Sequence, residues 1–472
     1  MRTDYSLRQH SLLYRQRAGN VKGTYGFVQK GMAVRDCRWP GNDEMYWDIA
    51  KYRQILRKRY QETAFPPCMH LPVCDILIFG QLWQRAFCRH WHTSPDIIRS
   101  DSSMKKIAII TSGGDAPGMN AAITAIVKAA ARRGIECIGI KRGFNGLLTI
   151  SADNQKDLQY FDLETVLDNA DRPGTQLRTA RCDDFRKPEY QKKGADNLRA
   201  LGVDAVVVIG GDGSFQGALR LVEQGIPCVG IPGTIDNDLA FTEMTLGYET
   251  AVQVCTEAIR DIRATSRSHN RPHVVECMGR HCGDVALKAA CATGAEIVLV
   301  PEVKWDIETV AQRLCYQIRK ENPRATIVIA EGCWDSMMPF DAYSYLNPRG
   351  KKFREDDKIN ASFLASILQR KCIDILGLNE GSPDRYHDEG DELAVRSTVV
   401  GYTQRGRMPV AKDSAFAFEA GHLAVSLLCK GYSGQVIGTR HGRVFHMDMA
   451  DALKEKRTFR HDLYDLVNDI RE

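Results

Sequence analysis

A stretch from Ala205 to Asp238 constrains the fold more than any other part of the chain. It opens with an unbroken apolar run, Ala205-Val206-Val207-Val208-Ile209, which breaks at a glycine-rich turn, Gly210-Gly211-Asp212-Gly213-Ser214. Short β-branched runs bounded by glycine are typical of strands buried on both faces, as in parallel sheets. The amphipathic segment that follows predicts a helix, and a second short run, Cys228–Ile231, predicts the next strand. The stretch therefore predicts a β–α–β unit within an α/β fold.

Acidic residues and glycines gather where these two strands end. A glycine-rich turn that opens a helix offers backbone N–H groups to a phosphate, and the acidic residue within it, Asp212, is suited to Mg²⁺. The second strand ends at Pro232-Gly233-Thr234-Ile235-Asp236-Asn237-Asp238, which adds two carboxylates and a hydroxyl at the same edge. A phosphate cradle, a metal carboxylate and a candidate base on adjacent strand ends are what phosphoryl transfer requires. A pair of ordinary β–α turns is the alternative for this stretch taken alone.

The same pattern repeats along most of the chain. Apolar runs predict strands near 107–110, 137–140, 273–277, 297–300, 325–330 and 395–400. Amphipathic segments predict helices near 121–132, 165–171, 249–265, 285–292, 307–320 and 414–429. Polar turns are expected at 111–120, 174–181, 266–271 and 278–284, and turns at the carboxyl ends of strands bind ligands in open α/β sheets. Residues 333–392 depart from this pattern and are interpreted as an insertion with a helix near 360–375. A turn and strand region is expected at 431–444 and a charged amphipathic tail at 449–472.

Residues 1–103 differ from the rest of the chain. They carry an excess of Arg and Lys, whereas the chain from Met104 is slightly acidic, so the net charge of +5 does not indicate nucleic-acid binding by the main body. No helix or strand period is sustained there. Acids such as Asp36 and Glu44 argue against a mitochondrial transit peptide. We expect a poorly ordered extension, or a gene-start error with the native start near Met104; a regulatory arm is the alternative.

Cysteine usage and hydropathy bear on the compartment. The chain has 15 cysteines, scattered and without Cys-x-x-Cys or zinc-like spacing. Most lie in apolar runs, where a buried thiol is expected, and a reducing, cytoplasmic compartment fits best. No run approaches the ~18 apolar residues of a membrane span, so no membrane partner is expected.

The turns between Thr111 and Gly406 resemble, closely and in order, those of the 6-phosphofructokinase family. The matching motifs are Gly113–Asn120, Gly210–Ser214, Pro232–Asp238, Met278-Gly279-Arg280, Pro301-Glu302, Glu331-Gly332 and Gln404-Arg405-Gly406. A single Gly-Gly-Asp-Gly turn is a weak signal, because NAD kinases and diacylglycerol kinases share it, but the whole set in register is specific. No Walker A motif occurs, which excludes an ordinary P-loop NTPase. The resemblance implies two Rossmann-like three-layer α/β/α domains of the phosphofructokinase fold, 104–247 with 404–457 for the nucleotide and 248–403 with 458–472 for the sugar phosphate.

The resemblance also implies an activity and residue roles. It implies phosphorylation of fructose 6-phosphate at C1 by Mg-ATP, the committed step of glycolysis, with Asp236 as general base and Arg280 stabilising the migrating phosphoryl group. Asp212 would bind Mg²⁺, and Asp238 would support the base or the metal. The nucleotide would meet Gly114, Arg181, Cys182, Gly211, Gly213 and Ser214. Fructose 6-phosphate would be held by Thr234, Asp236, Arg271, Met278, Gly279, Arg280, Glu331, Arg396, Tyr402 and Arg405. In the family, the positions of Arg271 and Arg396 come from a neighbouring subunit, which implies a homotetramer.

Two glycines bear on the phosphoryl donor. Family members that use pyrophosphate carry an acidic or bulky residue where Gly213 sits and a Lys where Gly233 sits. Both side chains would fill the space of the ATP α-phosphate and adenosine, so the glycines predict ATP. The alternatives are a pyrophosphate-dependent or relaxed sugar-phosphate kinase, and a non-catalytic regulatory subunit on the same fold. Retention of Asp212, Asp236 and Arg280 argues against the regulatory subunit.

Several positions depart from the family's usual pattern. Tyr402 replaces His, Ser414 replaces Arg, and Arg407 replaces Gly, which puts a new cation beside the sugar-phosphate clamp and predicts altered substrate affinity or preference. At the effector site, Thr124 and Lys128 stand where many bacterial members carry Arg. Arg263, Glu296 and Lys320 still match there, but Asn322 replaces Lys, so control by ADP or phosphoenolpyruvate is not expected.

Overall fold

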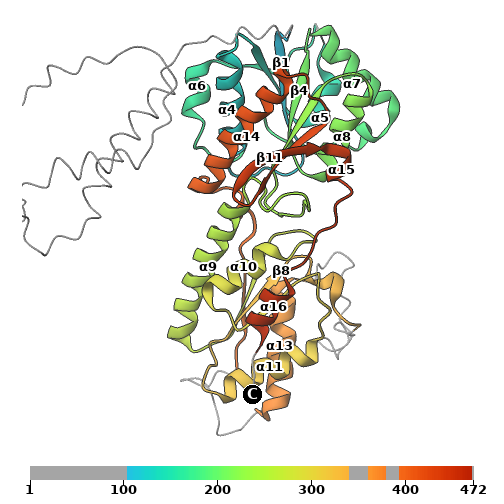
Figure 1. The fold of residues 1–472 in the computed structure, drawn as a ribbon. Helices are drawn as coiled ribbons and strands as arrows, with labels where there is room; N and C mark the ends of the chain where they lie inside the picture. Colours follow the sequence, from blue (N-terminus) through green and yellow to red (C-terminus); the bar gives the residue numbers. More distant parts are fainter. Residues whose placement is uncertain (1–103, 152, 340–359, 379–392, 470–472) are drawn as a thin grey trace, which may run out of the picture. The chain divides into compact units, whose positions relative to one another are not determined.

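The computed structural model describes residues 104–151, 153–339, 360–378 and 393–469. The extension expected at 1–103 and parts of the expected insertion, 340–359 and 379–392, lie outside these residues. Within them the predicted α/β class is confirmed: the strands form two sheets, and helices cover both faces of each sheet (Figure 1).

The first sheet has seven strands in the order β11-β10-β5-β4-β1-β2-β3. Their bounds are β1 Lys106–Thr111, β2 Glu136–Ile140, β3 Leu158–Tyr160, β4 Ala205–Gly210, β5 Cys228–Pro232, β10 Gln435–Arg440 and β11 Arg443–Asp448. All neighbours pair in parallel except β2 with β3 and β10 with β11. From β1 the chain moves outward to β2 and β3, then returns to place β4 on the other side of β1. The β1/β4 boundary is therefore the topological switch point, where open α/β sheets bind ligands.

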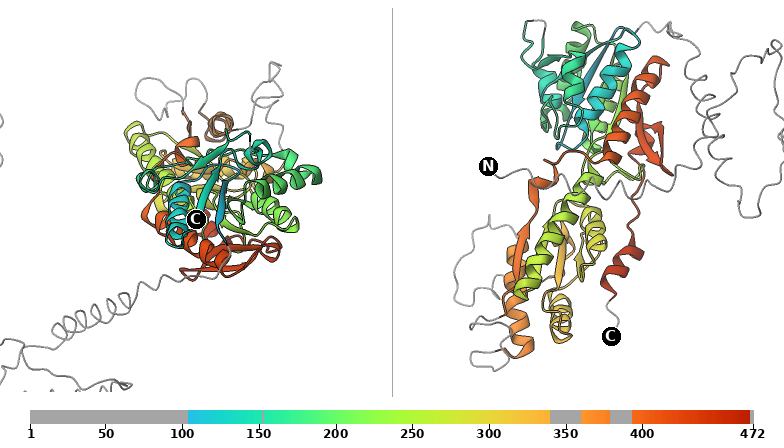
Figure 2. Two further views of the ribbon diagram at one scale, coloured as in Figure 1. Left: turned by 90° about the horizontal axis from the view of Figure 1, so that it is seen from above. Right: turned by 90° about the vertical axis from the view of Figure 1, so that its left-hand side faces the viewer.

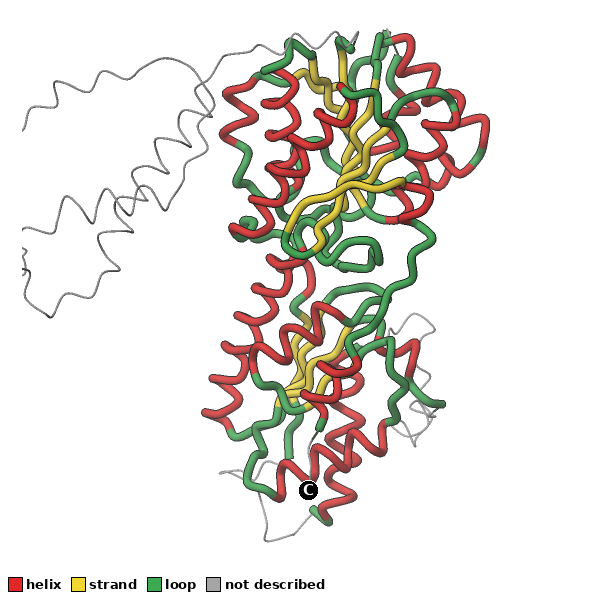
Figure 3. The backbone as a smooth tube through the Cα atoms, viewed as in Figure 1, coloured by secondary structure: helices red, strands yellow, loops and turns green. Residues whose placement is uncertain are grey.

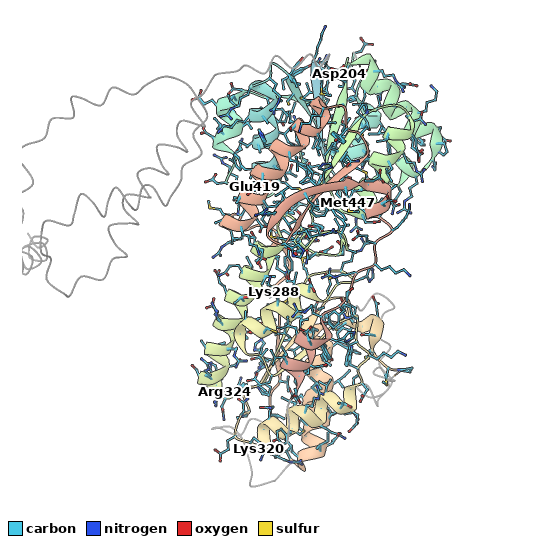
Figure 4. The ribbon with its side chains drawn as sticks, in the orientation of Figure 1. Asp204, Lys288, Lys320, Arg324, Glu419 and Met447 are labelled. Carbon is cyan, nitrogen blue, oxygen red and sulfur yellow. The ribbon has the colours of Figure 1, made fainter. Side chains whose placement is uncertain are left out.

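Side-chain alternation explains why the central strands are apolar throughout. One face of β1 and β4, with Ile109 and Val207, packs against α4 (Met119–Ala131), α14 (Ala411–Cys429) and α6 (Leu163–Asp168). The opposite face, with Ile110 and Val208, packs against α5 (Gly143–Thr149), α7 (Pro188–Ala200), α8 (Asp212–Glu223) and α15 (Met449–Ala452). Two further views show the same two helical layers (Figure 2). Asp204, labelled in Figure 4, anchors the start of β1 because its Oδ2 accepts from the N–H groups of Lys105 and Lys106 at 2.6 and 2.8 Å.

The second sheet has four parallel strands in the order β7-β8-β6-β9. Their bounds are β6 His273–Cys277, β7 Ile297–Leu299, β8 Thr326–Ala330 and β9 Arg396–Val399. One face packs against α9 (Tyr248–His269), α10 (Asp284–Thr293) and α16 (His461–Asn468), and the other against α11 (Ile307–Arg319) and α13 (Ala361–Leu376). Lys288 projects from α10 on the side of α9 (Figure 4), where its Nζ lies 3.1 Å from Oε1 of Glu249.

Two expectations change in this half of the chain. The polar turn expected at 266–271 is wrong in its first part: α9 continues to His269 and ends at Asn270, whose φ of 52° terminates the helix. The helix expected inside the insertion is α13, and its residues Ala361, Leu364 and Leu368 are completely buried against the second sheet. This part of the expected insertion is therefore a structural layer of the domain.

Within the described residues, the chain crosses between the two sheets at three places. These are the connection from β5 through α9 to β6, the connection from β9 through the short helix η3 (Gly401–Gln404) to α14, and residues 453–460 between α15 and α16. Figure 3 shows the loops at these crossings and at the sheet ends in green. Together they bring residues from both sheets to one set of turns.

Candidate active site

Hydrogen bonds from Thr245 and Leu246 hold the turn that follows β5. The N–H of Leu246 donates to the carbonyl oxygen of Pro232 at 2.7 Å, and Oγ1 of Thr245 donates to the carbonyl oxygen of Thr234 at 2.6 Å. The N–H of Thr245 donates to Oδ1 of Asn237 at 3.0 Å, and Asn237 has a φ of 53°. Asn tolerates this left-handed conformation better than most residues. The bracing fixes the residues on either side of Asn237, which are the two aspartates of the motif.

Asp236 offers a proton acceptor that the protein itself does not use. Its side chain is buried, and Oδ1 has no hydrogen-bond partner among the described residues. The nearest cation is Nη2 of Arg405 at 3.9 Å, which is too long for a hydrogen bond. Burial and the Asp238 carboxylate raise the pKa of Asp236 to about 6, although Arg405 opposes this. Most of the Asp236 population is therefore ionised at neutral pH and can accept a proton.

Three carboxylates face one region at the ends of β4 and β5. Asp212 begins α8, is exposed, and accepts from Nε2 of Gln216 at 2.6 Å. Reduced hydration and the charge of Asp212 raise the pKa of Asp238, which itself raises the pKa of Asp236. Asp238 is nevertheless exposed at the protein surface. Because β4 and β5 pair in parallel, the turns that carry Asp212, Asp236 and Asp238 leave the same edge of the sheet.

The turns after β1 and β4 touch at the switch point. Oγ of Ser214 donates to the carbonyl oxygen of Ser112 at 3.2 Å, and a Cβ on Gly210 would lie 2.6 Å from that oxygen. The loop with Arg181 and Cys182 joins them, because Oγ1 of Thr179 donates to the carbonyl oxygen of Gly113 at 2.9 Å. The residues expected to meet the nucleotide therefore line adjacent turns.

Arg405 connects the turn after β1 to the candidate base. Its Nη1 donates to the carbonyl oxygen of Asp115 at 2.7 Å, while Nη2 faces Asp236. A Cβ on Gly114 would lie 2.6 Å from Nη1 of Arg405. Glycine at position 114 therefore leaves room for this guanidinium.

A third group of site residues lies at the carboxyl end of the second sheet. Oε1 of Glu331, directly after β8, accepts from the N–H groups of Gly279 at 3.2 Å and Arg280 at 2.5 Å. The N–H of Met278 donates to Oε1 of Gln404 at 2.8 Å, and Gln404 is completely buried. Glu331 thus supports the backbone of the 278–280 turn, and Arg280 adopts a φ of 54° with an exposed side chain.

Two predicted substrate residues lie at the opposite edge of the second sheet. Arg271 precedes β6 and Arg396 begins β9, and the N–H of Arg396 donates to the carbonyl oxygen of Pro272 at 3.0 Å. The five residues of β6 separate this edge from Met278. At about 3.3 Å per residue, that strand alone spans about 16 Å. Within one chain, the structure does not bring Arg271 and Arg396 to the carboxylates of the site.

The structure shows the contacts and exposure of the residues that depart from the family pattern, and the space around the two glycines that bear on the phosphoryl donor. Tyr402 is 82% exposed in η3. Nη2 of Arg407 lies 2.8 Å from Oε2 of Glu257 on α9, so a carboxylate partly neutralises the extra cation. A Cβ on Gly213 would meet nothing within 4 Å, as the argument for ATP requires. The argument fails at Gly233, where a Cβ would point into the core, 2.8 Å from Cγ2 of Ile209.

Four of the expected effector-site residues, Thr124, Arg263, Glu296 and Asn322, make contacts within the chain. Oγ1 of Thr124 donates to the carbonyl oxygen of Val166 at 2.7 Å and is buried. The Glu296 carboxylate pairs with Arg263 at 2.8 Å and accepts from Nδ2 of Asn322 at 3.2 Å and from the N–H of Thr326 at 2.7 Å. These contacts occupy both oxygens of Glu296.

A metal held by Asp212 would need ligands beyond the described residues. No group of three or more His, Cys, Asp or Glu side chains among the described residues forms a ready metal site. A single exposed carboxylate such as Asp212 suits Mg²⁺, which in nucleotide sites is held by one or two carboxylates, waters and phosphate oxygens.

In the described part of the chain, no helix has both the length and the apolarity to cross a bilayer.

Comparison with known proteins places the chain in a family. A family model described as Phosphofructokinase matches residues 106–428. The chain belongs to this family. Over 367 residues it is 39% identical to an ATP-dependent 6-phosphofructokinase of Bacillus mycoides, which covers 78% of this chain and 99% of that protein. Over 364 residues it is 38% identical to an ATP-dependent 6-phosphofructokinase of Clostridium botulinum, covering 77% and 98%.

Solved structures agree on the fold. A phosphofructokinase from Saccharomyces cerevisiae matches with a TM-score of 0.59 and 31% identity over 74% of this chain, which spans 45% of the yeast chain. A pyrophosphate-dependent phosphofructokinase from Marinobacter aquaeolei matches with a TM-score of 0.59 and 20% identity, covering 76% and 88%. At that identity the second likeness supports the phosphofructokinase fold alone.

Some residues around the site were not predicted from the sequence. Asp413 is completely buried and accepts from the N–H groups of Gly247 at 2.9 Å and Thr250 at 2.8 Å, which caps α9. Its position just before Ser414 gave no sign of this role. Asp284 contacts Asn237 in the turn after β5, and Arg457 pairs with Asp284. Their sequence signals are a single Asp after a strand and a single Arg in a charged tail.

Proposed function

We propose that the chain transfers the γ-phosphoryl group of ATP to the C1 hydroxyl of fructose 6-phosphate. In this reaction the C1 oxygen forms a bond to the γ-phosphorus, the bond from that phosphorus to the β,γ-bridging oxygen breaks, and ADP leaves. Asp236 accepts the proton of the C1 hydroxyl. The products are fructose 1,6-bisphosphate, ADP and a proton that Asp236 passes to solvent.

The observation that carries this proposal is the buried, unpartnered oxygen of Asp236 beside Arg405. An acceptor held in place without a protein donor is available to a substrate hydroxyl, and such a base contributes roughly 10²–10⁴-fold to the rate. Arg405 lies close enough to stabilise negative charge on the reacting groups. Arg280, with its exposed side chain on the turn supported by Glu331, is assigned to the migrating phosphoryl group.

The nucleotide is assigned to the switch point of the first sheet. The N-terminus of α8 and the turns at Gly114 and Gly211–Ser214 present backbone N–H groups to phosphates. Asp212 would hold Mg²⁺, which when bound neutralises charge on the β- and γ-phosphates. The open space over Gly213 and the ATP-dependent relatives support ATP as the donor.

The proposal includes assembly and location. Arg271 and Arg396 lie at the amino ends of β6 and β9, away from the carboxylates of their own chain. We therefore assign them to binding the 6-phosphate of the sugar in the active site of a neighbouring subunit, within a homotetramer. Guanidinium groups suit a phosphate dianion. We place the enzyme in the cytoplasm, where thiols such as Cys228 and Cys333, which are free and buried here, stay reduced.

A coupled assay tests the function and the choice of donor. The purified full chain is given fructose 6-phosphate and Mg²⁺ with either ATP or pyrophosphate, and production of fructose 1,6-bisphosphate is followed. We expect turnover with ATP and at least a hundredfold lower kcat/KM with pyrophosphate. Preference for pyrophosphate would move the chain to the second kinase class, and no turnover with either donor would support a regulatory subunit.

A further inference from the structure

The segment between α15 and α16 is linked to the turn that contains Asp236 through the side chain of Arg457, which contacts Asp284. Arg457 in this segment forms an ion pair through Nη2 with Oδ2 of Asp284, the first residue of α10. The two side chains are only 24% and 16% exposed. Nη1 of Arg457 is buried and has no hydrogen-bond partner among the described residues. The pair is therefore largely removed from water, where its geometry matters more than at the surface.

Asp284 in turn holds the residue between the two catalytic aspartates. The same Oδ2 that meets Arg457 accepts from Nδ2 of Asn237 at 2.9 Å. Oδ1 of Asn237 already accepts from the N–H of Thr245, so both ends of the amide are fixed. Because the amide is held on both sides, the left-handed backbone at Asn237 is held as well, and with it the directions in which Asp236 and Asp238 point.

The partly buried carboxylate of Glu302 adds negative charge near Asp284 and Arg457. Oε1 of Glu302 accepts from the N–H of Gly283 at 2.9 Å, while its Oε2 is buried with no hydrogen-bond partner among the described residues. Burial raises the pKa of Glu302 and the nearby Asp284 charge adds to this, whereas Arg457 lowers it. Without Arg457, the negative charges of Asp284 and Glu302 would lose their shared counter-charge in a poorly hydrated region, and we expect Asp284 to lose its contact with Asn237.

We infer that Arg457 and Asp284 form a positioning relay for the catalytic turn. Arg457 fixes the carboxylate of Asp284, Asp284 fixes the amide of Asn237, and Asn237 sets the orientation of Asp236. The inference rests on the proposed function, since it concerns how the base of that reaction is aimed. Both Arg457 and Asp284 act through Asn237, so they are positioning residues.

The relay is tested by a double-mutant cycle in the full-length chain. Arg457→Met, Asp284→Ala and the double variant are compared by kcat, by KM for both substrates and by Tm. Because the two residues act in series, each single variant should lose kcat by about 10- to 100-fold with KM changed less than about threefold, and the double variant should lose no more than the worse single variant. Arg457→Lys should recover part of kcat. Arg460→Met is the matched control, because Arg460 is exposed and pairs with Asp462 at the surface.

A crystal structure of Arg457→Met tests the relay without reference to activity. We expect the Asn237–Asp284 hydrogen bond to be lost and the Asp236 carboxylate to be displaced. The relay is wrong if that hydrogen bond persists, if the two single effects multiply in the double variant, or if Arg460→Met loses kcat equally. An inactive wild-type chain would contradict the proposed function, while the crystal structure would still decide the relay.

Discussion

Replacing Gly213 with Asp should impair the use of ATP, and the structure sets the size of the effect. A Cβ at this position meets nothing within 4 Å, so a side chain can begin here without a clash. Its carboxylate would lie beside the turn assigned to the nucleotide phosphates. Two like charges about 5 Å apart repel by about 3 kcal/mol at an effective dielectric constant of ~20. Because Gly213 is exposed, solvent and salt lower this to about 1–2 kcal/mol, so KM for ATP should rise about 5- to 30-fold.

Steady-state kinetics with two control variants separate charge from size. Gly213→Asn has nearly the same shape without the charge and should raise KM for ATP by no more than about threefold. Gly213→Ala should bind ATP normally and keep or slightly raise Tm, since φ at this position is not positive. The reasoning is refuted if Gly213→Asp leaves KM for ATP unchanged, or if Asn impairs it as much as Asp does.

Two further predictions concern stability and assembly. Burial raises the pKa of Asp413 to about 6, above its unfolded value, so the folded protein holds this proton more tightly. The free energy of unfolding of the wild type should therefore fall by roughly 2–3 kcal/mol more than that of Asp413→Asn as the pH rises from about 4 to about 6; equal pH dependence of Tm in both would contradict this. If Arg396 binds substrate in the site of a neighbouring subunit, two inactive variants should complement each other. Asp236→Asn and Arg396→Ala chains are dissociated, mixed and reassembled, and activity should return at sites that receive both native residues. Mixtures that stay inactive would indicate that each site is built from one chain.

Much of the fold followed from local sequence patterns. Strands such as β4 and β5 were predicted because a parallel strand that is buried on both faces consists mostly of apolar residues, and every residue of these two strands is buried. The helix α7 was missed because it is polar, with a buried face made only of Gln191, Gly194, Ala195 and Leu198. The end of α9 was predicted too early because Ser266–His269 is polar, yet tertiary packing carries the helix to Asn270.

The site was predictable where a short motif contains the chemistry. The turns with Asp212 and Asp236 carry their own acidic groups, and the structure places them at one sheet edge. The argument from Gly233 for ATP was wrong because the sequence does not show in which direction a side chain at this position would point. In the structure, a Cβ there would point into the core. Arg457 could not be found because its contact with Asp284 joins segments 173 positions apart, as the two residue numbers show. Such contacts depend on the tertiary arrangement of segments that are distant in the sequence.

The most direct test of the central claim is the kcat of Asp236→Asn measured with fructose 6-phosphate and Mg-ATP from pH 5 to 9. The wild type should lose activity below about pH 6, because protonation of the carboxyl, whose pKa is raised to about 6, removes the proton acceptor. The Asn variant should be slower by roughly 10²–10⁴-fold with little change in KM, and it should lack this acid limb. A variant within tenfold of the wild type, or one that keeps the same acid limb, would contradict the assignment of Asp236 as the base.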